Sequence, residues 1–590
     1  MGRPKPTFIL FYWFPGIRWL TSFGFPYKFS KFTNISYYCI ILIDSKQMKR
    51  ALITALILYL LLTGYISYAL PSISISNTLM FNSNVIMPSD TIPVVVHVIH
   101  TGTPIGSPDN PPDSLINELL NQMNAAFQLD GPLYGGADIG FAFQLATRSP
   151  TCTTSTGINR IDGSGIPLYA TGGITGDTNF NPNSAYEVPV KGLSRWPNTD
   201  YLNIWIVNTI DNNPFWPGGY AYFPEYNGAR IDGIVLRASV VNGTNKTIIH
   251  ELGHYFSLYH TFGYAWDECM PDTNCLINGD LICDTENCIN EYDCSSITNI
   301  CTSEEWIVVD PEHEYTVLNN YMGYTDCQWM FTEDQKTRMQ YALNTFRPGL
   351  LSSLALDNTE LMTPSQACIP SSVNGLSAFY GIERVDVGSL NVYSNTSLAD
   401  GAFYVDRTCN QQVEVEAGDS IPIRITPSYL NWSQVRLFID YNNDGTFAQS
   451  GESILSSEGW IIEDTIVVPL SQITMCVPLR LRVVVDHWDA PQPTACLLTG
   501  NMADGVGQIE DYSLIIRPRH IESVSSGGWT TPGIWSCNCI PGASDEVTIK
   551  SGHTVTITPA MGSIQCADVH LQPNALLQMD GVMHVAGGCN

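Results

Sequence analysis

The sequence is short of basic residues. Lys and Arg together number 27 among 590 residues, against 56 Asp and Glu, so the formal net charge is −29. Nucleic acids and anionic membrane surfaces are held by clusters of positive charge, and this balance therefore argues against both as partners. An acidic surface of this kind is typical of solubility, although acidic calcium-binding loops would also contribute to it.

Paired CxxC motifs are also absent, which lowers the expectation of a cysteine-bound metal. Of the 17 cysteines, Cys39 lies upstream of a secretion signal, which leaves an even number in the rest of the chain. An even number of cysteines in an exported protein predicts disulfide bonds. With 44% hydrophobic and 14% charged residues the chain has the composition of a folded protein. Its length suggests about three or four domains.

A secretory signal peptide is predicted at residues 48–69, which read MKRALITALILYLLLTGYISYA. The segment has a basic start, an apolar run and a small-residue end, with cleavage expected after about Ala69. A signal anchor that stays in the membrane is the alternative, but Gly64 and its polar neighbours shorten the apolar run below a good membrane span. Because such a signal normally begins the chain, residues 1–47 are interpreted as a non-native upstream extension. The mature protein is therefore expected to be secreted, without a stable membrane anchor.

The region from residue 92 to 352 alternates strand and helix signals, as an α/β domain does. The run IPVVVHVIH at 92–100 is nearly all apolar, which is typical of a strand buried on both faces. Residues 114–129 place apolar side chains at helical spacing, and Asp113 or Ser114 is available to cap that helix. Further strands are predicted at 139–148, 201–210 and 233–241.

All-β signals follow this region. Beyond an aperiodic linker, short alternating runs separated by turn residues predict a β-sandwich. The last segment is Gly-rich and β-like, as in a β-repeat. The predicted parts are the upstream extension 1–47, the signal peptide 48–69, a short lead-in or pro-segment 70–91, the α/β domain 92–352, the linker 353–375, the β-sandwich 376–518 and the β-rich C-terminal segment 521–590.

The stretch HELGHYFSLYH, residues 250–260, carries the most specific chemical signal. His250 and His254 stand four residues apart, so on a helix both imidazoles point to one side and can bind one metal ion. Glu251 is one step round the helix and can reach a water molecule on that metal without ligating it. Zinc lowers the pKa of such a water to about 7. The carboxylate can then take the water's proton during attack on a carbonyl and pass it to the leaving amine.

The third histidine, His260, cannot reach the metal from the same straight helix, because ten residues place it about 15 Å along the axis. The helix must therefore end and the chain must turn back. Glycine suits such a turn best because it tolerates positive φ, yet Ser257 stands here. A left-handed L-residue costs about 1–2 kcal/mol. Ser257 is interpreted as tolerated strain and not as an inactivating change, since Glu251 and all three histidines are present.

The stretch HELGHYFSLYHTF resembles the HExxHxxGxxH zinc helix of the metzincin peptidases, and its trailing HTF is typical of their pappalysin-like, or cytophagalysin, branch. IPVVVHVIH, FAFQLATR and TGINRI are similar to upstream strands of that family, and NNYMGYTDCQWMFTEDQKTRM is similar to its Met-turn and following helix. The resemblance covers about residues 92–350. It implies a metzincin catalytic domain with His250, His254 and His260 as zinc ligands and Glu251 as the general base.

The same resemblance implies that Met322 forms a hydrophobic floor beneath the zinc and that Tyr324 stabilises the oxyanion. A thioether does not compete with three imidazoles for zinc, so Met322 is expected to pack and not to ligate. A phenol two residues beyond a tight turn can donate a hydrogen bond to a developing negative charge. The departure from the family pattern is Ser257, which replaces its glycine.

A second metal site is implied by NGDLICDTE, which resembles the calcium-binding insert of the family. Asp280, Asp284 and Thr285 would supply oxygen ligands to calcium. The alternative is an ordinary acidic loop pinned by the neighbouring cysteines.

Substrate selection is predicted at Asp326, two residues beyond Tyr324. In metzincins this segment forms one wall of the pocket for the substrate residue just after the scissile bond. A carboxylate there would favour Arg or Lys at that substrate position. The alternative is that Asp326 faces solvent or caps the turn.

The predicted β-sandwich resembles the GEVED domain of exported bacterial proteins. GQIEDYSLII matches the signature of that domain, with Gln508 and Ile509 in place of Glu and Val, and FIDYNNDGTF matches its acidic loop. The all-β C-terminal domains are expected to serve binding or stability, because they show no catalytic set.

The acidic loop itself leaves two interpretations open. Asp440, Asn442 and Asp444 resemble the start of an EF-hand-type loop, but the twelfth position is Gly451, and Glu452 comes one residue late. Calcium binding and a simple Asn-Asp-Gly turn are both consistent with this pattern.

The leading hypothesis is a secreted zinc-dependent endopeptidase that hydrolyses peptide bonds by glutamate-assisted attack of zinc-bound water, with protein or peptide substrates and calcium as a second cofactor. The alternative is a non-catalytic secreted adhesion or glycan-binding protein that uses a metzincin-like scaffold and binds a glycan or surface partner through its C-terminal β domains. A metal-dependent amidase acting on cell-wall peptides is a weaker third hypothesis. The presence of Glu251 and Tyr324 favours the endopeptidase.

Overall fold

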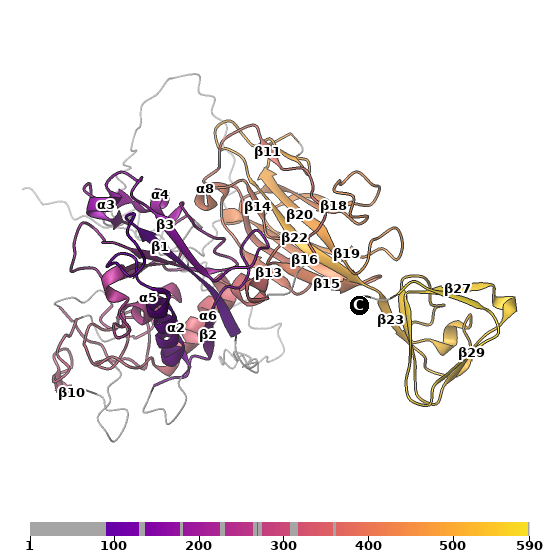
Figure 1. Cartoon of the computed structure of the whole chain (residues 1–590), viewed down its shortest axis with the longest axis horizontal. Helices are drawn as coiled ribbons and strands as arrows, with labels where there is room; N and C mark the ends of the chain where they lie inside the picture. The colour runs from indigo at the N-terminus through magenta and orange to yellow at the C-terminus, as the bar shows by residue number, and fades with distance from the viewer. Residues whose placement is uncertain are drawn as a thin grey trace, which may run out of the picture. The chain divides into compact units, whose positions relative to one another are not determined.

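The computed structural model describes residues 90–587 and Cys589, apart from 129–135, 177–180, 225–229, 264–267, 270–273, 307–316, 358–361 and 492 (Figure 1). The upstream extension, the signal peptide and nearly all of the lead-in lie outside the described residues and stay predictions. Within the described part of the chain, no helix is long and apolar enough to cross a membrane.

The N-terminal region, residues 90–352, is built on one sheet with the strand order β2-β1-β6-β8-β7, and β3 also pairs with β1 (Figure 1). All neighbours are parallel except β7, which runs antiparallel to β8 at the edge of the sheet. The strands are β1 Asp90–His100, β2 Phe141–Leu145, β3 Ile158–Asp162, β6 Leu202–Val207, β7 Gly219–Ala221 and β8 Ile234–Arg237. The predicted strands are therefore present. β1 begins two residues earlier than expected, whereas β2, β6 and β8 are shorter than expected, and a 3-10 helix, Ala238–Val240, follows β8.

Several short elements complete the N-terminal region. They are α3 Tyr169–Gly172, β4 Ile174–Thr175, β5 Ala185–Tyr186, α4 Glu187–Lys191, β9 Thr298–Asn299, β10 Glu304–Glu305 and α7 Gly349–Ser352. The long helices are α2 Asp113–Phe127, α5 Thr247–Tyr255 and α6 Glu333–Phe346.

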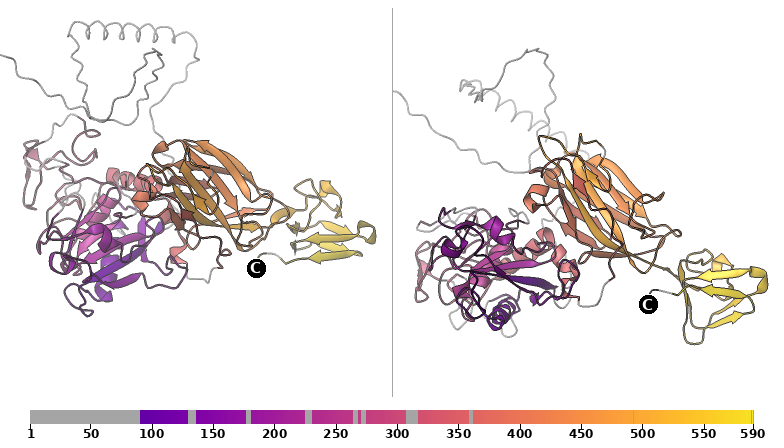
Figure 2. Two further views of the ribbon diagram at one scale, coloured as in Figure 1. Left: turned by 90° about the horizontal axis from the view of Figure 1, so that it is seen from above. Right: turned by 45° about the horizontal axis from the view of Figure 1, so that its top comes forward.

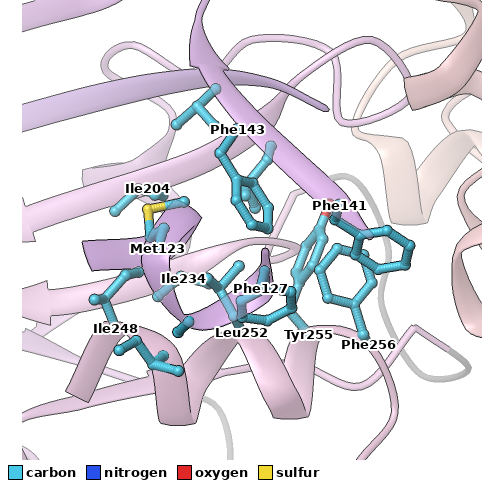
Figure 3. Close-up of a cluster of buried hydrophobic side chains, with 14 of the residues drawn as sticks. Met123, Phe127, Phe141, Phe143, Ile204, Ile234, Ile248, Leu252, Tyr255 and Phe256 are labelled. Carbon is cyan, nitrogen blue, oxygen red and sulfur yellow. The ribbon is translucent and has the colours of Figure 1, made fainter. Parts of the chain in front are cut away.

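A single hydrophobic cluster fixes α5, the helix with the HExxH stretch, against the sheet. Alternate residues of β1 face this cluster, and Val95 and Ile99 are buried in other clusters, so that strand is almost wholly apolar. Figure 3 shows side chains of α2, β2 and α5 meeting in it, among them Met123, Phe127, Phe141, Phe143 and Leu252. Each large side chain buried in this way contributes about 1.5–3 kcal/mol.

The start of α2 differs from the prediction. Neither Asp113 nor Ser114 caps the helix, because its N-cap residue is Pro112, which makes no side-chain cap hydrogen bond. Asp113 is the first helical residue, and its carboxylate pairs with the guanidinium of Arg160 on β3. Asp113, which was expected to cap the helix, thus forms an ion pair instead.

The second region is a β-sandwich, as the alternating runs predict. Its two sheets have the orders β13-β12-β16-β19 and β14-β22-β20-β17-β18, with β15 also on β22, and they enclose one hydrophobic core. The strands are β12 Ile382–Val387, β13 Leu390–Tyr393, β14 Tyr404–Asp406, β15 Gln412–Glu416, β16 Ser420–Pro427, β17 Ser433–Ile439, β18 Ser453–Gly459, β19 Ile462–Val467, β20 Pro478–His487 and β22 Gln508–Arg517. Helix α8 Ser397–Asp400 and two 3-10 turns, Leu354–Leu356 and Ser428–Leu430, lie outside the sheets, and β11 Ser371–Ser372 in the linker pairs with β21 Leu497–Leu498.

Two acidic residues of the β22 signature hold the sandwich together from inside. Glu510 pairs with Arg407 at 2.7 Å, and Asp511 pairs with Arg482 at 2.6 Å, with all four side chains buried. A buried charge without its partner would cost about 3–5 kcal/mol. The signature therefore has a structural explanation that needs no catalytic role.

The C-terminal segment forms three short parallel sheets, with the orders β23-β25-β28, β24-β26-β29 and β27-β30. The chain passes from sheet to sheet, and each strand pairs in parallel with one from the preceding turn, so the segment coils as a small β-solenoid (Figure 2). Its strands are β23 Arg519–Glu522, β24 Gly527–Gly528, β25 Asp545–Ile549, β26 Thr554–Ile557, β27 Ser563–Cys566, β28 Asp568–Leu571, β29 Leu576–Met579 and β30 Val582–Val585, with 3-10 turns at Pro532–Ile534 and Pro559–Met561.

The expected disulfide bonds are present in all three regions. They join Cys152–Cys409, Cys269–Cys301, Cys275–Cys283, Cys294–Cys327, Cys368–Cys496, Cys476–Cys589 and Cys537–Cys539. The first of these links the N-terminal region to the β-sandwich. Cys288 and Cys566 are buried free thiols.

Helix α5 ends where the spacing of the histidines requires it to end. Ser257 has a φ of 75°, in the left-handed region. Its N–H donates to the carbonyl of His254 at 2.9 Å, and the N–H of Leu258 donates to that of Gly253 at 2.8 Å. This pair of bonds is a Schellman motif, in which a left-handed residue closes the helix and reverses the chain. The predicted strain at Ser257 is therefore present, and the turn sends His260 back towards α5.

Replacing Ser257 should separate the strain of this turn from the hydroxyl that the serine carries. Ser257→Gly removes the left-handed strain, whereas the matched control Ser257→Ala removes the hydroxyl and keeps the strain. We expect the glycine variant to be more stable than the alanine variant by about 1 kcal/mol, after allowance for the greater freedom of glycine in the unfolded chain. Thermal unfolding of the two purified variants measures this difference. An alanine variant as stable as the glycine variant would show that the turn is unstrained.

Candidate active site

Three imidazoles converge at the end of α5. The Nε2 atoms of His250 and His254 lie 3.2 Å apart, and that of His260 lies 3.1 Å from His254 and 3.2 Å from His250. The ligand atoms of these three side chains all lie within 4.8 Å of one another. Among the described residues, they are the one group of three or more His, Cys, Asp or Glu side chains that lie this close together. The structure thus brings together the three residues that the sequence singled out as metal ligands.

The tautomers of two of these histidines show that the arrangement fits a bound cation. Nδ1 of His250 lies 2.7 Å from the carbonyl oxygen of Tyr321, and Nδ1 of His254 lies 2.7 Å from that of Leu258. A carbonyl only accepts, so each Nδ1 carries the proton and each Nε2 presents a lone pair. Lone pairs of two neutral imidazoles repel at this distance unless a cation lies between them. Zn–N bonds of about 2.0–2.1 Å in a tetrahedron would place the nitrogens about 3.3 Å apart, close to what is observed.

Burial keeps the three imidazoles neutral. Loss of solvent lowers the pKa of His250 to about 4 and, together with the neighbouring His250, that of His254 to about 3. Burial and the other two histidines also lower the pKa of His260. A metal ligand must be deprotonated at the ligating nitrogen, so the site is prepared to bind a cation at neutral pH.

Glu251 lies beside the triad and beneath the edge strand β7. Its side chain is buried, and burial raises the pKa of its carboxyl to about 8, an effect opposed by the N–H of Ala221, which donates to it. A cation at the three imidazoles would favour the ionised carboxylate and lower this pKa. A carboxyl with a pKa near neutrality is suited to accept a proton and release it again.

Tyr324 approaches the triad from the segment after the Met-turn. Its hydroxyl lies 3.1 Å from Nε2 of His260, and its ring packs edge-on against Trp216 with the ring centroids 5.6 Å apart. Burial, with the charge of Glu251 as a second cause, raises the pKa of the Tyr324 phenol. The phenol therefore stays protonated at neutral pH and is available as a hydrogen-bond donor at the mouth of the site.

Met322 lies beneath the helix and is fully buried. A Cβ built on Gly253 would come within 2.2 Å of the Met322 sulfur, so only glycine leaves room for the thioether at this position. The sulfur thus packs against the backbone of the residue that precedes His254. This geometry agrees with the expectation that Met322 packs.

The Met-turn is itself fixed by an amide network. Asn320 accepts a hydrogen bond from the N–H of Met322 at 2.9 Å and exchanges side-chain hydrogen bonds with Gln335. Gln335 and Thr332 form the capping box of α6. Because the carbonyl of Tyr321 holds His250, the start of α6 positions one imidazole of the triad through this turn.

The site opens into a cleft of about 1520 Å³. That volume exceeds the range of about 300–1,000 Å³ common for small-molecule pockets and suits a longer ligand. The lining includes β7, the histidine triad, Glu251, Tyr324 and Asp326. Asp326 is exposed on the cleft wall, and burial lowers the pKa of the nearby Lys246 although the charge of Asp326 opposes this effect. The Cys294–Cys327 disulfide ties this wall to the segment that follows the acidic insert.

The three predicted calcium ligands take part in two sets of hydrogen bonds. The Thr285 hydroxyl donates to the buried carboxylate of Asp280 at 2.8 Å, and burial raises the pKa of Asp280 to about 7. Asp284 instead accepts hydrogen bonds from the Thr332 hydroxyl at 2.6 Å and from the N–H of Asp334 at 2.9 Å. Asp284 thus connects the insert to the start of α6. Calcium at the insert stays a prediction.

Three groups that position the site were not predicted from the sequence. They are the carbonyl of Tyr321, the N–H of Ala221 and Gly253. The two backbone groups carry no side-chain signal and become visible only once β7 and the Met-turn are placed. Gly253 stands inside the HELGH stretch, and a glycine within a helix is a signal in itself, because it costs about 1 kcal/mol relative to alanine and calls for a packing reason.

Comparisons with known proteins agree with this geometry. Residues 190–344 match the family model described as pregnancy-associated plasma protein-A, of the M43 peptidases, and residues 434–515 match the GEVED domain. An extracellular metalloprotease of Arthroderma otae is 28% identical over 173 residues, which are 25% of this chain and 59% of that protein. One of Pyricularia oryzae is 32% identical over 164 residues, which are 25% of this chain and 50% of that protein. The chain thus spans between half and three fifths of the length of these two relatives.

Among solved structures, mature mirolysin of Tannerella forsythia in complex with a cleaved peptide is 25% identical, with a TM-score of 0.33, and the match covers 46% of this chain and 98% of mirolysin. Both resemblances predicted from the motifs are confirmed by the family models, whereas the predicted domain limits stay predictions. The chain therefore carries a peptidase domain of the pappalysin family, followed by a GEVED domain.

Proposed function

We propose that this protein is a secreted zinc endopeptidase. The observation that carries the proposal is the convergence of three neutral imidazole nitrogens, 3.1–3.2 Å apart, beside a buried glutamate. His250, His254 and His260 would hold the metal. The relatives named as extracellular metalloproteases support the same activity.

His250, His254 and His260 would hold a zinc ion, which would supply a Lewis acid and would lower the pKa of a water molecule to about 7. Glu251 would accept a proton from the attacking water and would deliver it to the leaving amine. The Tyr324 hydroxyl donates a hydrogen bond to the oxygen on which negative charge develops. The buried surroundings of Glu251 strengthen these interactions by excluding bulk water.

Peptide binding is proposed along strand β7. This strand pairs with β8 on one side only and lies at the end of the sheet, where its other side faces the cleft. An extended substrate can add to such an edge through main-chain hydrogen bonds that do not depend on its sequence. The N–H of Ala221 on β7 already contacts Glu251, so a peptide bound there would lie next to the general base.

Two substitutions should distinguish the role of the general base from that of the metal ligands. Glu251→Ala is expected to reduce peptide hydrolysis by at least ~10²-fold while the protein keeps about one zinc per chain, because the carboxylate acts on the water and not on the metal. His260→Ala should lose both zinc and activity. Metal analysis and hydrolysis of a protein substrate, with and without a chelator, measure both properties. Near-normal activity in either variant, or a zinc-free wild type, would contradict the proposal.

Asp326 is proposed as the residue that selects the substrate side chain just after the cut. Its exposed carboxylate lies on the cleft wall beside Tyr324, which supports a preference for Arg or Lys at that position. Lys246 stands close enough to compete for this carboxylate and would limit the preference.

A digest of a peptide library tests this assignment. Asp326→Asn keeps the shape of the side chain and removes its charge, so it should weaken the preference for basic residues by about tenfold, the value of one charge-assisted hydrogen bond. Asp326→Ala should weaken the preference equally. An unchanged preference in both variants would show that another residue selects the substrate.

Export is proposed to begin at the signal peptide of residues 48–69. The disulfides of the described regions and the extracellular relatives support an exported protein. A chain that starts at Met48 should therefore be secreted and cleaved near Ala69. N-terminal sequencing of the secreted protein measures this, and the recovery of residues 1–47 on that protein would refute it.

A further inference from the structure

An acidic loop of the GEVED domain, residues 440–452, has features of a metal site that the proposed peptidase does not use. The loop joins β17 to β18 and carries Asp440, Asp444 and Glu452. Asp440 and Glu452 are fully buried, whereas Asp444 is exposed. The loop therefore combines two buried carboxyl groups with a third that reaches solvent.

The buried Glu452 has an oxygen without a partner. Its Oε2 accepts a hydrogen bond from the N–H of Gln449 at 2.9 Å, and the N–H of Asn442 also lies towards the carboxylate, but the buried Oε1 has no hydrogen bond of ordinary length and angle. Burying an ionised oxygen without a donor or a cation costs several kcal/mol, as an order of magnitude. A buried carboxylate that faces other carboxylates therefore indicates a missing positive charge.

Among the described residues, no ion pair joins a basic side chain to these three carboxylates. Arg480 is a neighbour, because its carbonyl accepts the N–H of Asp440 at 3.0 Å, but its guanidinium pairs with Asp406 at 3.1 Å and Asp511 at 2.6 Å. Burial raises the pKa of Asp440 and Glu452, backbone N–H groups that donate to both carboxylates oppose this effect, and the charges of the neighbouring acids add to it. The carboxyl groups thus repel one another in the absence of a cation.

The chemistry of the loop favours calcium over zinc. Zinc in proteins takes about four ligands, with a preference for nitrogen and sulfur, whereas calcium takes about 6–8 oxygen ligands at distances of about 2.3–2.6 Å. The loop offers carboxylate oxygens together with the amide oxygen of Asn442 and the backbone oxygen of Thr446, and it has no imidazole or thiol. Oxygen ligands of these kinds are the ones that calcium takes in proteins.

We propose that residues 440–452 bind one calcium ion, with Asp440, Asp444 and Glu452 as its acidic ligands and Asn442 as an amide ligand. Glu452 fills the place that an acidic residue one position earlier holds in an EF-hand loop. The structure explains how it does so, because Glu452 is turned inward and its N–H bonds to the carbonyl of Gln449 at 3.2 Å.

The calcium ion would have a structural role in holding the linker. Asn443 accepts a hydrogen bond from the N–H of Ser365 at 2.9 Å through its side chain, and its carbonyl accepts the Ser365 hydroxyl at 2.7 Å. A Cβ on Gly445 would come within 2.5 Å of the carbonyl of Gln366. Ordering the loop would therefore also order this part of the linker between the peptidase and GEVED domains.

Calcium titration of the full-length secreted protein tests the proposal. The protein is freed of calcium and kept loaded with zinc, and calcium chloride is added while heat of binding and thermal unfolding are recorded. We expect a binding event with a Kd of about 10⁻⁶–10⁻³ M and a rise in the unfolding temperature. Asp444→Asn, at an exposed position that leaves the fold intact, should weaken binding at least ~10-fold. The matched control is Asp464→Asn on β19, which should bind calcium as the wild type does.

Glu452→Gln distinguishes a ligand from an ordinary structural residue. It removes a buried charge, so the calcium-free variant should unfold at the same temperature as the wild type or higher, and it should lose the stabilisation by calcium. A binding curve unchanged in both loop variants, or lost only in Asp280→Asn of the peptidase insert, would overturn the proposal. So would a calcium-free Glu452→Gln protein that unfolds at a lower temperature than the wild type, or a wild type that binds no calcium.

Discussion

The repulsion between the Nε2 lone pairs of His250 and His254 is the constraint on which the rest of the site depends. Backbone carbonyls fix Nδ1 of both residues as donors, and their Nε2 atoms are then held 3.2 Å apart, a distance that a shared cation makes favourable. Every nearby feature keeps these nitrogens and that of His260 together. The α5 helix sets the spacing of the first two, the left-handed Ser257 returns the third, and Met322 packs beneath them.

Bringing the three histidines together costs free energy at several residues of the domain. Gly253 weakens the helix locally so that Met322 can approach, and Ser257 accepts a strained backbone. The hydrophobic cluster beneath α5 and the capping box of α6 supply the stability that offsets both. The GEVED domain shows the same principle in its signature, where the acidic residues are matched by buried arginines.

Much of the site was predictable from the sequence, because helical spacing alone places His250, Glu251 and His254 and requires the chain to turn before His260. The buried strand at 92–100 was predictable for a similar reason, since both of its faces are apolar. Contacts between distant segments were not predictable. The carboxylate of Asp284 accepts hydrogen bonds from the start of α6, and Arg160 pairs with Asp113, which was expected to cap α2. The local sequence shows that an acidic residue is present, but it does not show whether a cation or the start of a helix will be its partner.

X-ray absorption at the zinc edge of the purified, zinc-loaded protein tests the central claim most directly, because it counts and identifies the atoms around the metal. The account predicts three imidazole nitrogens at about 2.0–2.1 Å and no sulfur neighbour, since Met322 packs and the free thiol of Cys288 is buried. A sulfur shell at about 2.3 Å, or a spectrum with only one or two imidazoles, would contradict it.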